Sequence, residues 1–210
     1  MKHRSMFFGA VCAAALLLLP LSGRSQEKAK TEPPAIQGAD MEAMMKKWME
    51  AATPGEAHKK LNDMVGKWKT TSRVWMNGLD APPTETQGSS EVKWVLDGRF
   101  LQQEAKGEMM GRPYNGVGFT GYDNMNKKYV TLWIDNTNTA MFIADGTMDQ
   151  AGKVLTTVGK MDEPATGEHD KSAMYIYRME TRDRHIMEIH DLSLPQGKTK
   201  VMEMVYTREK

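Results

Sequence analysis

The chain has 210 residues, of which 28 are basic and 27 are acidic, so its formal net charge at pH 7 is +1. A chain so close to neutrality offers no electrostatic basis for binding nucleic acid or an anionic membrane surface. Its single cysteine, Cys12, excludes disulfide bonds within the chain.

The first 25 residues are predicted to form a secretory signal peptide. Residues 2–4 carry positive charge, an apolar run follows over residues 6–21, and small residues then lead to a predicted cleavage after Ser25. The run is shorter than the roughly 20 apolar residues that span a bilayer, which favours cleavage over a retained anchor helix. Cys12 lies near the start of this run, whereas a lipidated cysteine would follow it.

Cleavage would leave about 185 residues without a cysteine, and 25 basic against 27 acidic residues. That length suits one domain with a substantial core. Any metal site would have to be built from His, Asp, Glu or Met. We therefore expect a periplasmic or secreted protein that has no membrane span after signal cleavage and does not bind nucleic acid.

Two segments are expected to precede the main domain. Residues 26–40 are rich in charge, proline and small side chains, and are predicted to be a flexible linker. Residues 41–64 are predicted to be a helical segment, which Pro54 and Gly55 divide in two. An apolar stripe with helical spacing runs along its first part. The stripe consists of Met41, Met44, Met45, Trp48, Met49 and Ala52. Such a stripe predicts that the helix packs at one mouth of the following domain, as a lid or plug.

Residues 65–210 are predicted to form the main domain, because strand and turn patterns replace the helical one. The predicted strands cover residues 67–76, 85–96, 99–107, 114–122, 128–134, 139–147, 153–160, 171–180, 184–192 and 199–208. Turn residues such as Asp97-Gly98 separate several of them, and residues 162–170 are predicted to be the longest loop. The fold class is therefore all-β. We predict a single up-and-down antiparallel β-barrel of about ten strands, preceded by a short amphipathic helical segment, because closure removes exposed strand edges.

Motifs at the two ends of this domain resemble the calycin group, which includes lipocalins, fatty-acid-binding proteins and nitrobindin-like barrels. Gly66-Lys67-Trp68 opens the first strand as a G-x-W motif, and Arg208 closes the last strand. In such barrels a tryptophan of the first strand packs beneath an arginine of the last strand. The resemblance implies that Trp68 and Arg208 form a plug at one end of the barrel.

A closer resemblance covers residues 54–210. The chain resembles the bacterial domain-of-unknown-function family 1579, which implies a calycin-like barrel and no established activity. The segments that carry this resemblance are 65–68, 98–101, 118–124, 127–130 and 133–135.

The sequence also contains a G-x-G-x-x-G pattern, which is typical of dinucleotide-binding sites. The pattern covers residues 116–121, within a predicted strand. Dinucleotide binding needs the N-terminus of a helix after the glycines, to receive the pyrophosphate. The position of the glycines in a strand instead predicts that they permit tight curvature of the barrel.

Glu188 and His190 are the candidate ligand-binding residues. They lie two apart on a predicted strand and therefore share a face, whereas His185 points to the other face. Such a pair could hold the polar end of a ligand or act as an acid/base couple, but a solvated outer face or a single internal hydrogen bond in a polar lumen is the favoured interpretation. We predict no catalytic residue, no metal site and no cofactor. The methionine clusters, which could bind Cu(I), are also typical of a helix that faces a core.

The leading functional hypothesis is a small hydrophobic or amphiphilic ligand in the barrel lumen. A ten-stranded barrel is wider than its own side chains easily fill, so an internal cavity is expected. The first alternative is an enzyme that uses this cavity, with Glu188 and His190 as its coupled pair. The second is a structural or partner-binding protein whose barrel is filled.

Overall fold

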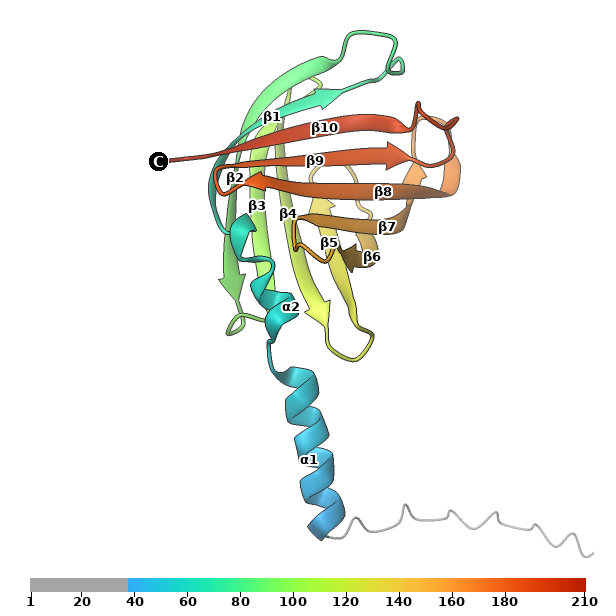
Figure 1. Cartoon of the computed structure of the whole chain (residues 1–210). Coiled ribbons are helices and arrows are strands. Elements are labelled where there is room, and N and C mark those ends of the chain that lie inside the picture. Colours follow the sequence, from blue (N-terminus) through green and yellow to red (C-terminus); the bar gives the residue numbers. More distant parts are fainter. Residues whose placement is uncertain (1–37) are drawn as a thin grey trace, which may run out of the picture. The chain divides into compact units, whose positions relative to one another are not determined.

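The structure is a computed structural model that describes residues 38–210 (Figure 1). The predicted signal peptide, residues 1–25, lies outside the described residues, as does most of the predicted linker. Three short helical elements come first: α1 (Gly38–Ala52), α2 (Glu56–Lys59) and the 3-10 helix η1 (Asn62–Met64).

Ten strands follow and form one closed antiparallel barrel. They are β1 (Gly66–Val74), β2 (Thr84–Val95), β3 (Phe100–Met109), β4 (Arg112–Asp123), β5 (Lys128–Asp135), β6 (Phe142–Met148), β7 (Val154–Glu163), β8 (Glu168–Thr181), β9 (Arg184–Asp191) and β10 (Lys200–Arg208). Each strand pairs with its neighbours in the sequence, and β1 pairs with β10 (Figure 1). The predicted fold class is confirmed, and every predicted strand overlaps an observed one.

The prediction of the longest loop is wrong. β7 extends to Glu163 and β8 begins at Glu168, so that only a turn remains at residues 164–167. The turn is tight because Gly167 adopts a φ of +71°, a left-handed conformation that glycine reaches without strain. The longest connection between strands is instead residues 75–83, between β1 and β2.

One end of the barrel is closed by α2 and η1 together with large side chains from the strands. Leu61 and Met64 come from this helical cap and are buried. The cap is tied to the barrel by two hydrogen bonds: the Trp68 indole donates to the carbonyl of Met64 at 3.0 Å, and the Tyr129 hydroxyl donates to the carbonyl of Ala57 at 2.9 Å. Below the cap, Trp68, Leu101, Tyr177 and Tyr206 fill the barrel with little or no exposure.

Trp68 and Arg208, the residues expected to plug one end, are in contact at this closed end. The Arg208 guanidinium carbon lies 4.1 Å from the centroid of the Trp68 ring, within cation–π reach. The same guanidinium donates to the carbonyls of Val65 at 2.7 Å and Asp63 at 3.1 Å. Gly66 has a φ of +144°, and a side chain there would collide with the guanidinium, which explains the glycine of the G-x-W motif.

Helix α1 does not act as a lid or plug, contrary to the prediction. Its apolar stripe is open to solvent: Trp48 is 70% exposed and Met49 is 60% exposed. The side-chain amide of Asn124 donates to the carbonyls of Ala51 and Thr53 at the C-terminal end of the helix, at 3.0 and 2.8 Å. The helical cap is therefore made by the shorter segment after Pro54. Within the described residues, no helix has the length and apolarity to cross a membrane.

His185 is fully buried next to the plug formed by Trp68 and Arg208. Its ring centroid lies 4.3 Å from that of Trp68 and 5.8 Å from that of Tyr177, and neither ring nitrogen has a hydrogen-bond partner among the described residues. Burial, reinforced by the positive charge of Arg208, lowers the pKa of His185 to about 4. Asp63 partly opposes this shift and Lys153 adds to it. The histidine is thus held neutral in the folded protein.

This burial predicts a loss of stability in mild acid. The unfolded chain takes up a proton at His185 below its ordinary pKa of about 6.5, whereas the folded chain does so only near 4. The free energy of unfolding should therefore fall by about 2–3 kcal/mol through this residue between pH 7.5 and 4.5. Urea denaturation at several pH values should show a shallower pH dependence for His185→Phe than for the parent. The exposed His169→Gln variant should keep the parent's slope, and equal slopes in all three proteins would contradict this assignment.

Candidate ligand-binding cavity

A cavity of about 520 Å³ occupies the barrel between the plug and the opposite end. Met64 and Tyr206 lie at its floor, beside the plug. At the other end it extends to Met76 and Met110, which are 64% and 78% exposed and mark an open rim. The barrel is therefore closed at one end only, because the helical cap and the large aromatic side chains all lie at the other.

Methionines and an isoleucine from β9 and β10 form one wall of this cavity, which we call the methionine wall. It consists of Met187, Ile189, Met202 and Met204. Strand alternation explains the set, because the residues lie two apart on each strand and Met204 pairs with Met187 in the register. Methionine side chains are flexible and polarisable, so this wall can adapt to apolar groups of different shapes.

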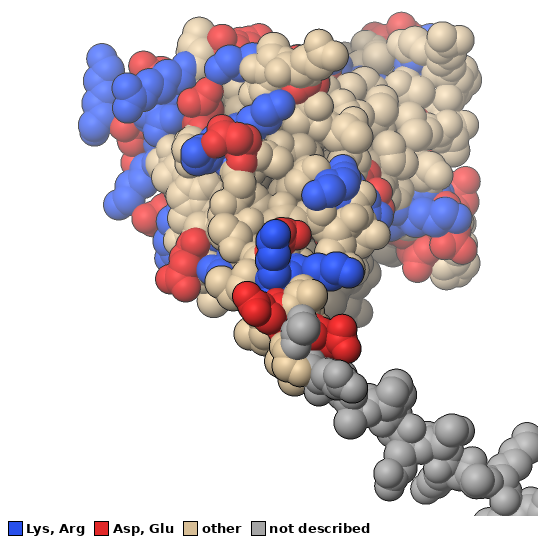
Figure 2. Space-filling view, turned by 60° about the horizontal axis from the view of Figure 1, so that its bottom comes forward, with Lys and Arg blue, Asp and Glu red and all other residues tan. Residues whose placement is uncertain are grey.

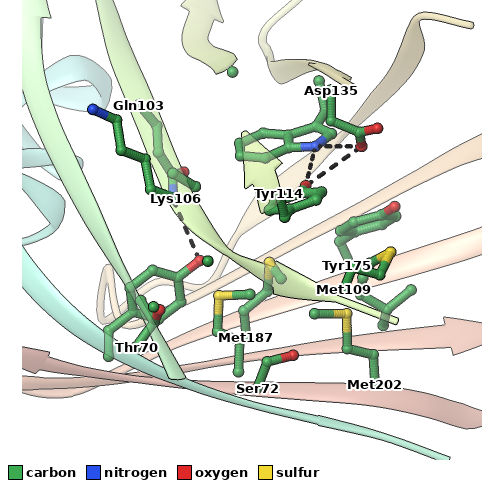
Figure 3. Close-up of a pocket in the computed structure, with 18 of the residues that line it drawn as sticks. Thr70, Ser72, Gln103, Lys106, Met109, Tyr114, Asp135, Tyr175, Met187 and Met202 are labelled. Atoms are coloured by element: carbon green, nitrogen blue, oxygen red, sulfur yellow. Dashed lines mark hydrogen bonds between the residues drawn. The ribbon is translucent and has the colours of Figure 1, made fainter. Parts of the chain in front are cut away.

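The opposite wall carries a hydrogen-bonded cluster of Tyr114 from β4 and Trp133 and Asp135 from β5 (Figure 3). The Trp133 indole donates to Oδ2 of Asp135 at 3.1 Å and lies 3.0 Å from the Tyr114 hydroxyl. The Tyr114 hydroxyl in turn donates to the same carboxylate oxygen at 3.4 Å. The other oxygen, Oδ1, accepts from the backbone and the hydroxyl of Thr137 at 2.9 and 2.5 Å. Four neutral donors thus hold the carboxylate in place.

Glycines of β4 determine how the Trp133 ring lies. Gly118 pairs with Trp133 in the β4–β5 register and Gly116 pairs with Asp135. A Cβ atom at Gly118 would lie 2.5 Å from Cε3 of Trp133, and a Cβ atom at Gly116 would overlap the same ring. The indole therefore rests on bare backbone. Curvature was the role predicted for these glycines. The structure shows in addition that they make room for an aromatic ring on the cavity wall.

Two further tyrosines belong to the cavity. Tyr175 packs against Phe142 with ring centroids 4.6 Å apart, and burial together with the negative charge of Asp135 raises the pKa of Tyr175 to about 12. At the floor, the Gln103 amide donates to the Tyr206 hydroxyl at 3.3 Å. Burial also raises the pKa of Tyr206 to about 12, so both tyrosines are neutral hydrogen-bonding groups at physiological pH.

Glu188 and His190 share a face of β9, but the face is the outer one. Strand alternation places Met187 and Ile189 in the cavity and therefore turns Glu188 and His190 away from it. Glu188 and His190 therefore do not line the lumen, contrary to the expectation that they hold a ligand there. The Glu188 carboxylate lies 3.8 Å from Nε2 of His190.

Basic side chains engage Glu188 on this outer face. Arg178 lies 3.5 Å and Lys200 lies 3.4 Å from its carboxylate oxygens. Lys200 also contacts Glu203 at 2.9 Å, and Glu203 contacts Arg73 at 3.2 Å. The pair thus belongs to a network of ion pairs that links neighbouring strands on the outside of the barrel.

The sequence carries a signal for this cavity cluster. Trp133 lies on the predicted strand 128–134 and Asp135 directly follows that strand, while Gly116 and Gly118 lie two apart on the strand before it. An aromatic residue opposite a glycine, on a face that also carries a carboxylate, indicates a ring packed on backbone beside a charge. Without the register of the two strands, however, these positions could not be matched.

The architecture and the open cavity define a calycin-like up-and-down barrel with one plugged end. The chain belongs to the family described as protein of unknown function (DUF1579), which its sequence matches over residues 53–208. The sequence matches no curated protein.

Solved structures resemble this chain at low sequence identity. Rv2717c from M. tuberculosis is 15% identical with a TM-score of 0.54, and the match covers 75% of this chain and 100% of that one. The S-type phycobiliprotein lyase CPES from Guillardia theta is 12% identical with a TM-score of 0.46, covering 78% of this chain and 97% of that one. The likeness to Rv2717c supports the fold alone.

The contact between Gly118 and Trp133 can be tested by substitution. Gly118→Ala should push the indole towards the lumen and lower the free energy of unfolding by about 1–3 kcal/mol, as overpacking does. Gly107→Ala on β3 is the matched control, because the nearest atom to its Cβ would lie at an ordinary 3.5 Å. The control should be neutral or stabilising by up to about 1 kcal/mol. Equal stability of the two variants in urea denaturation would contradict the packing described.

Proposed function

We propose that this barrel binds a small hydrophobic or amphiphilic molecule in its lumen. The observation that carries the proposal is the cavity itself, whose volume of about 520 Å³ falls in the range typical of small-molecule sites. One wall is lined by methionines and the other by a polar and aromatic cluster. Such a division suits a ligand with an apolar body and one polar group.

The depth of the cavity supports this proposal. Met64 and Tyr206 close the floor beside the plug, so a ligand that enters at the rim near Met110 would be surrounded by strands on all sides. Removal of apolar surface from water would then stabilise the complex by roughly 25 cal/mol per Å² of buried area. The polar cluster would fix the orientation of the ligand while contributing less of the binding free energy.

The alternatives have less support. The coupled pair that an enzyme would have used, Glu188 and His190, lies on the outer face in a network of ion pairs. The open cavity weighs against a filled barrel with a structural role. On the face shown in Figure 2, basic and acidic side chains are interspersed rather than gathered by sign, which gives no support to a nucleic-acid interface there.

Binding can be measured with the neutral lipophilic dye Nile red. Titration of the full-length mature protein should raise the fluorescence of the dye as it enters an apolar site. Ser72→Phe places a ring inside the cavity, opposite the polar cluster, and should weaken dye binding at least about tenfold by occupying volume. Lys69→Phe adds the same ring to the exposed outer face of β1 and should leave binding unchanged. Equal effects of the two variants, or no dye binding at all, would count against a lumen site.

We further propose that the barrel functions after export, in the periplasm or outside the cell. The support is the sequence of residues 1–25, with its basic start, its apolar run and its small residues before Gln26. Intact-mass measurement of protein from its native envelope should give a chain that begins at Gln26 or within a few residues. Recovery of a chain that begins at Met1, or of an acylated N-terminus, would contradict cleavage.

A further inference from the structure

Asp135 stands out among the charged residues of the cavity. Lys106 and Glu108 also touch the cavity, but they alternate with the inward residues of β3 and belong to its outer face at the rim. Lys171 and Asp191 do not line the cavity, and they pair with each other at 2.8 Å near the ends of β8 and β9. Among the charged residues of the lining within residues 38–210, Asp135 is therefore the one on an inward-facing position.

No lysine or arginine within residues 38–210 forms an ion pair with Asp135. Its partners are the indole of Trp133 and the hydroxyls of Tyr114 and Thr137, together with the backbone of Thr137, all of them neutral donors. Neutral donors fix the position of a carboxylate but leave its net charge in place. A negative charge thus faces a largely apolar cavity, and no basic side chain among the described residues pairs with it.

Aromatic rings line the cavity together with this charge. The Trp133 ring lies against Gly116 and Gly118 and lines the cavity. Tyr175 and Phe142, packed together, belong to the same part of the lining. Ring faces carry partial negative charge and attract cations within about 6 Å, most strongly when the site is shielded from water. A carboxylate and aromatic rings in one cavity lining are a combination that suits an ammonium group.

The methionine wall lies across the cavity from this cluster. In the closed strand order, β5 and β10 are separated by the strands β6 to β9 on one side and β4 to β1 on the other, so they face each other across the barrel. In Figure 3, Asp135 and Tyr114 accordingly lie on one side and Met187 and Met202 on the other. A molecule with a charged head at Asp135 would direct its apolar part to the methionines.

We infer that the ligand of this barrel is a cationic amphiphile, with a protonated amine or quaternary ammonium head held by Asp135 and Trp133. The inference rests on the proposed function and narrows it to a chemical class. It also predicts discrimination against fatty acids and other anionic amphiphiles. A ligand carboxylate near Asp135 would meet a like charge in a site of low dielectric constant.

The test compares three molecules with the same ten-carbon chain and different heads: decylammonium, decanol and decanoate. Each is titrated at pH 7 against Nile red bound to the full-length mature protein. Decylammonium should displace the dye at a concentration at least about tenfold lower than decanol, and decanoate should be weaker than decanol. Equal potency of decylammonium and decanol, or a preference for decanoate, would overturn the inference and leave the proposed function standing. Failure of all three to displace the dye would count against the lumen site itself.

Two variants test whether Asp135 causes the preference for the ammonium head. Asp135→Asn removes the charge at nearly constant volume, so the advantage of decylammonium over decanol should fall to within about twofold while decanol binding is retained. Glu91→Gln removes an exposed carboxylate from the outer face of β2 and should keep the full advantage. An unchanged advantage in Asp135→Asn would overturn the role of this residue. If that variant does not fold, the series of heads on the parent protein still decides the inference.

Discussion

The pairing of the first strand with the last is the constraint on which the rest of this barrel depends. In that pairing Trp68 lies directly opposite Arg208, so both side chains point to the same, inner side. The arginine covers the indole and donates hydrogen bonds to the carbonyls of Val65 and Asp63, just before the first strand. One side chain therefore fixes the register in which the sheet closes, the entry angle of the chain and the filling of one end.

The width of the barrel then determines where a cavity can form. A ring of ten strands is too wide for its interior to be filled by side chains of ordinary size at every level. At the closed end the gap is filled by Trp68, Tyr177 and Tyr206 and by the cap residues Leu61 and Met64. No such cap covers the other end among the described residues, and the inward positions there include serine, threonine, glycine and methionine. Asymmetry between the two ends, rather than a gap in the packing, creates the cavity.

Much of the fold could be predicted from the sequence because the signals for it are local. Turn residues separate the strands, and the G-x-W motif and Arg208 occupy the first and last strands, which closure must bring together. The prediction that α1 packs on the barrel as a lid or plug was wrong, because helical spacing shows only that one face of a helix is apolar and not what covers that face. The prediction of a long loop over residues 162–170 was wrong because Gly167 allows a tight turn within this segment.

The faces of the strands were harder to predict, because alternation shows which residues share a face without showing which face is inside. Starting from Trp68, the register places Met204 inside, and the next pairing places Met187 rather than Glu188 beside it. That step depends on the connection between β9 and β10 and on the irregularity between Lys200 and Met202. Neither can be inferred from spacing alone. A shift of one residue would have moved Glu188 and His190 into the lumen.

The division of the cavity into two walls follows from the same register. Because Gly118 pairs with Trp133, the indole can lie flat on the wall, where it leaves the centre of the barrel open. A larger residue at position 118 would force the ring inward and fill the space that a ligand needs. Asp135, two residues further along β5, then lies beside the ring and nearer the open end. The carboxylate is thus placed where an entering molecule meets it before reaching the plug. A molecule retained there by its charged end would have its other end free to cross to the methionines of β9 and β10, which form the apolar half of the same space.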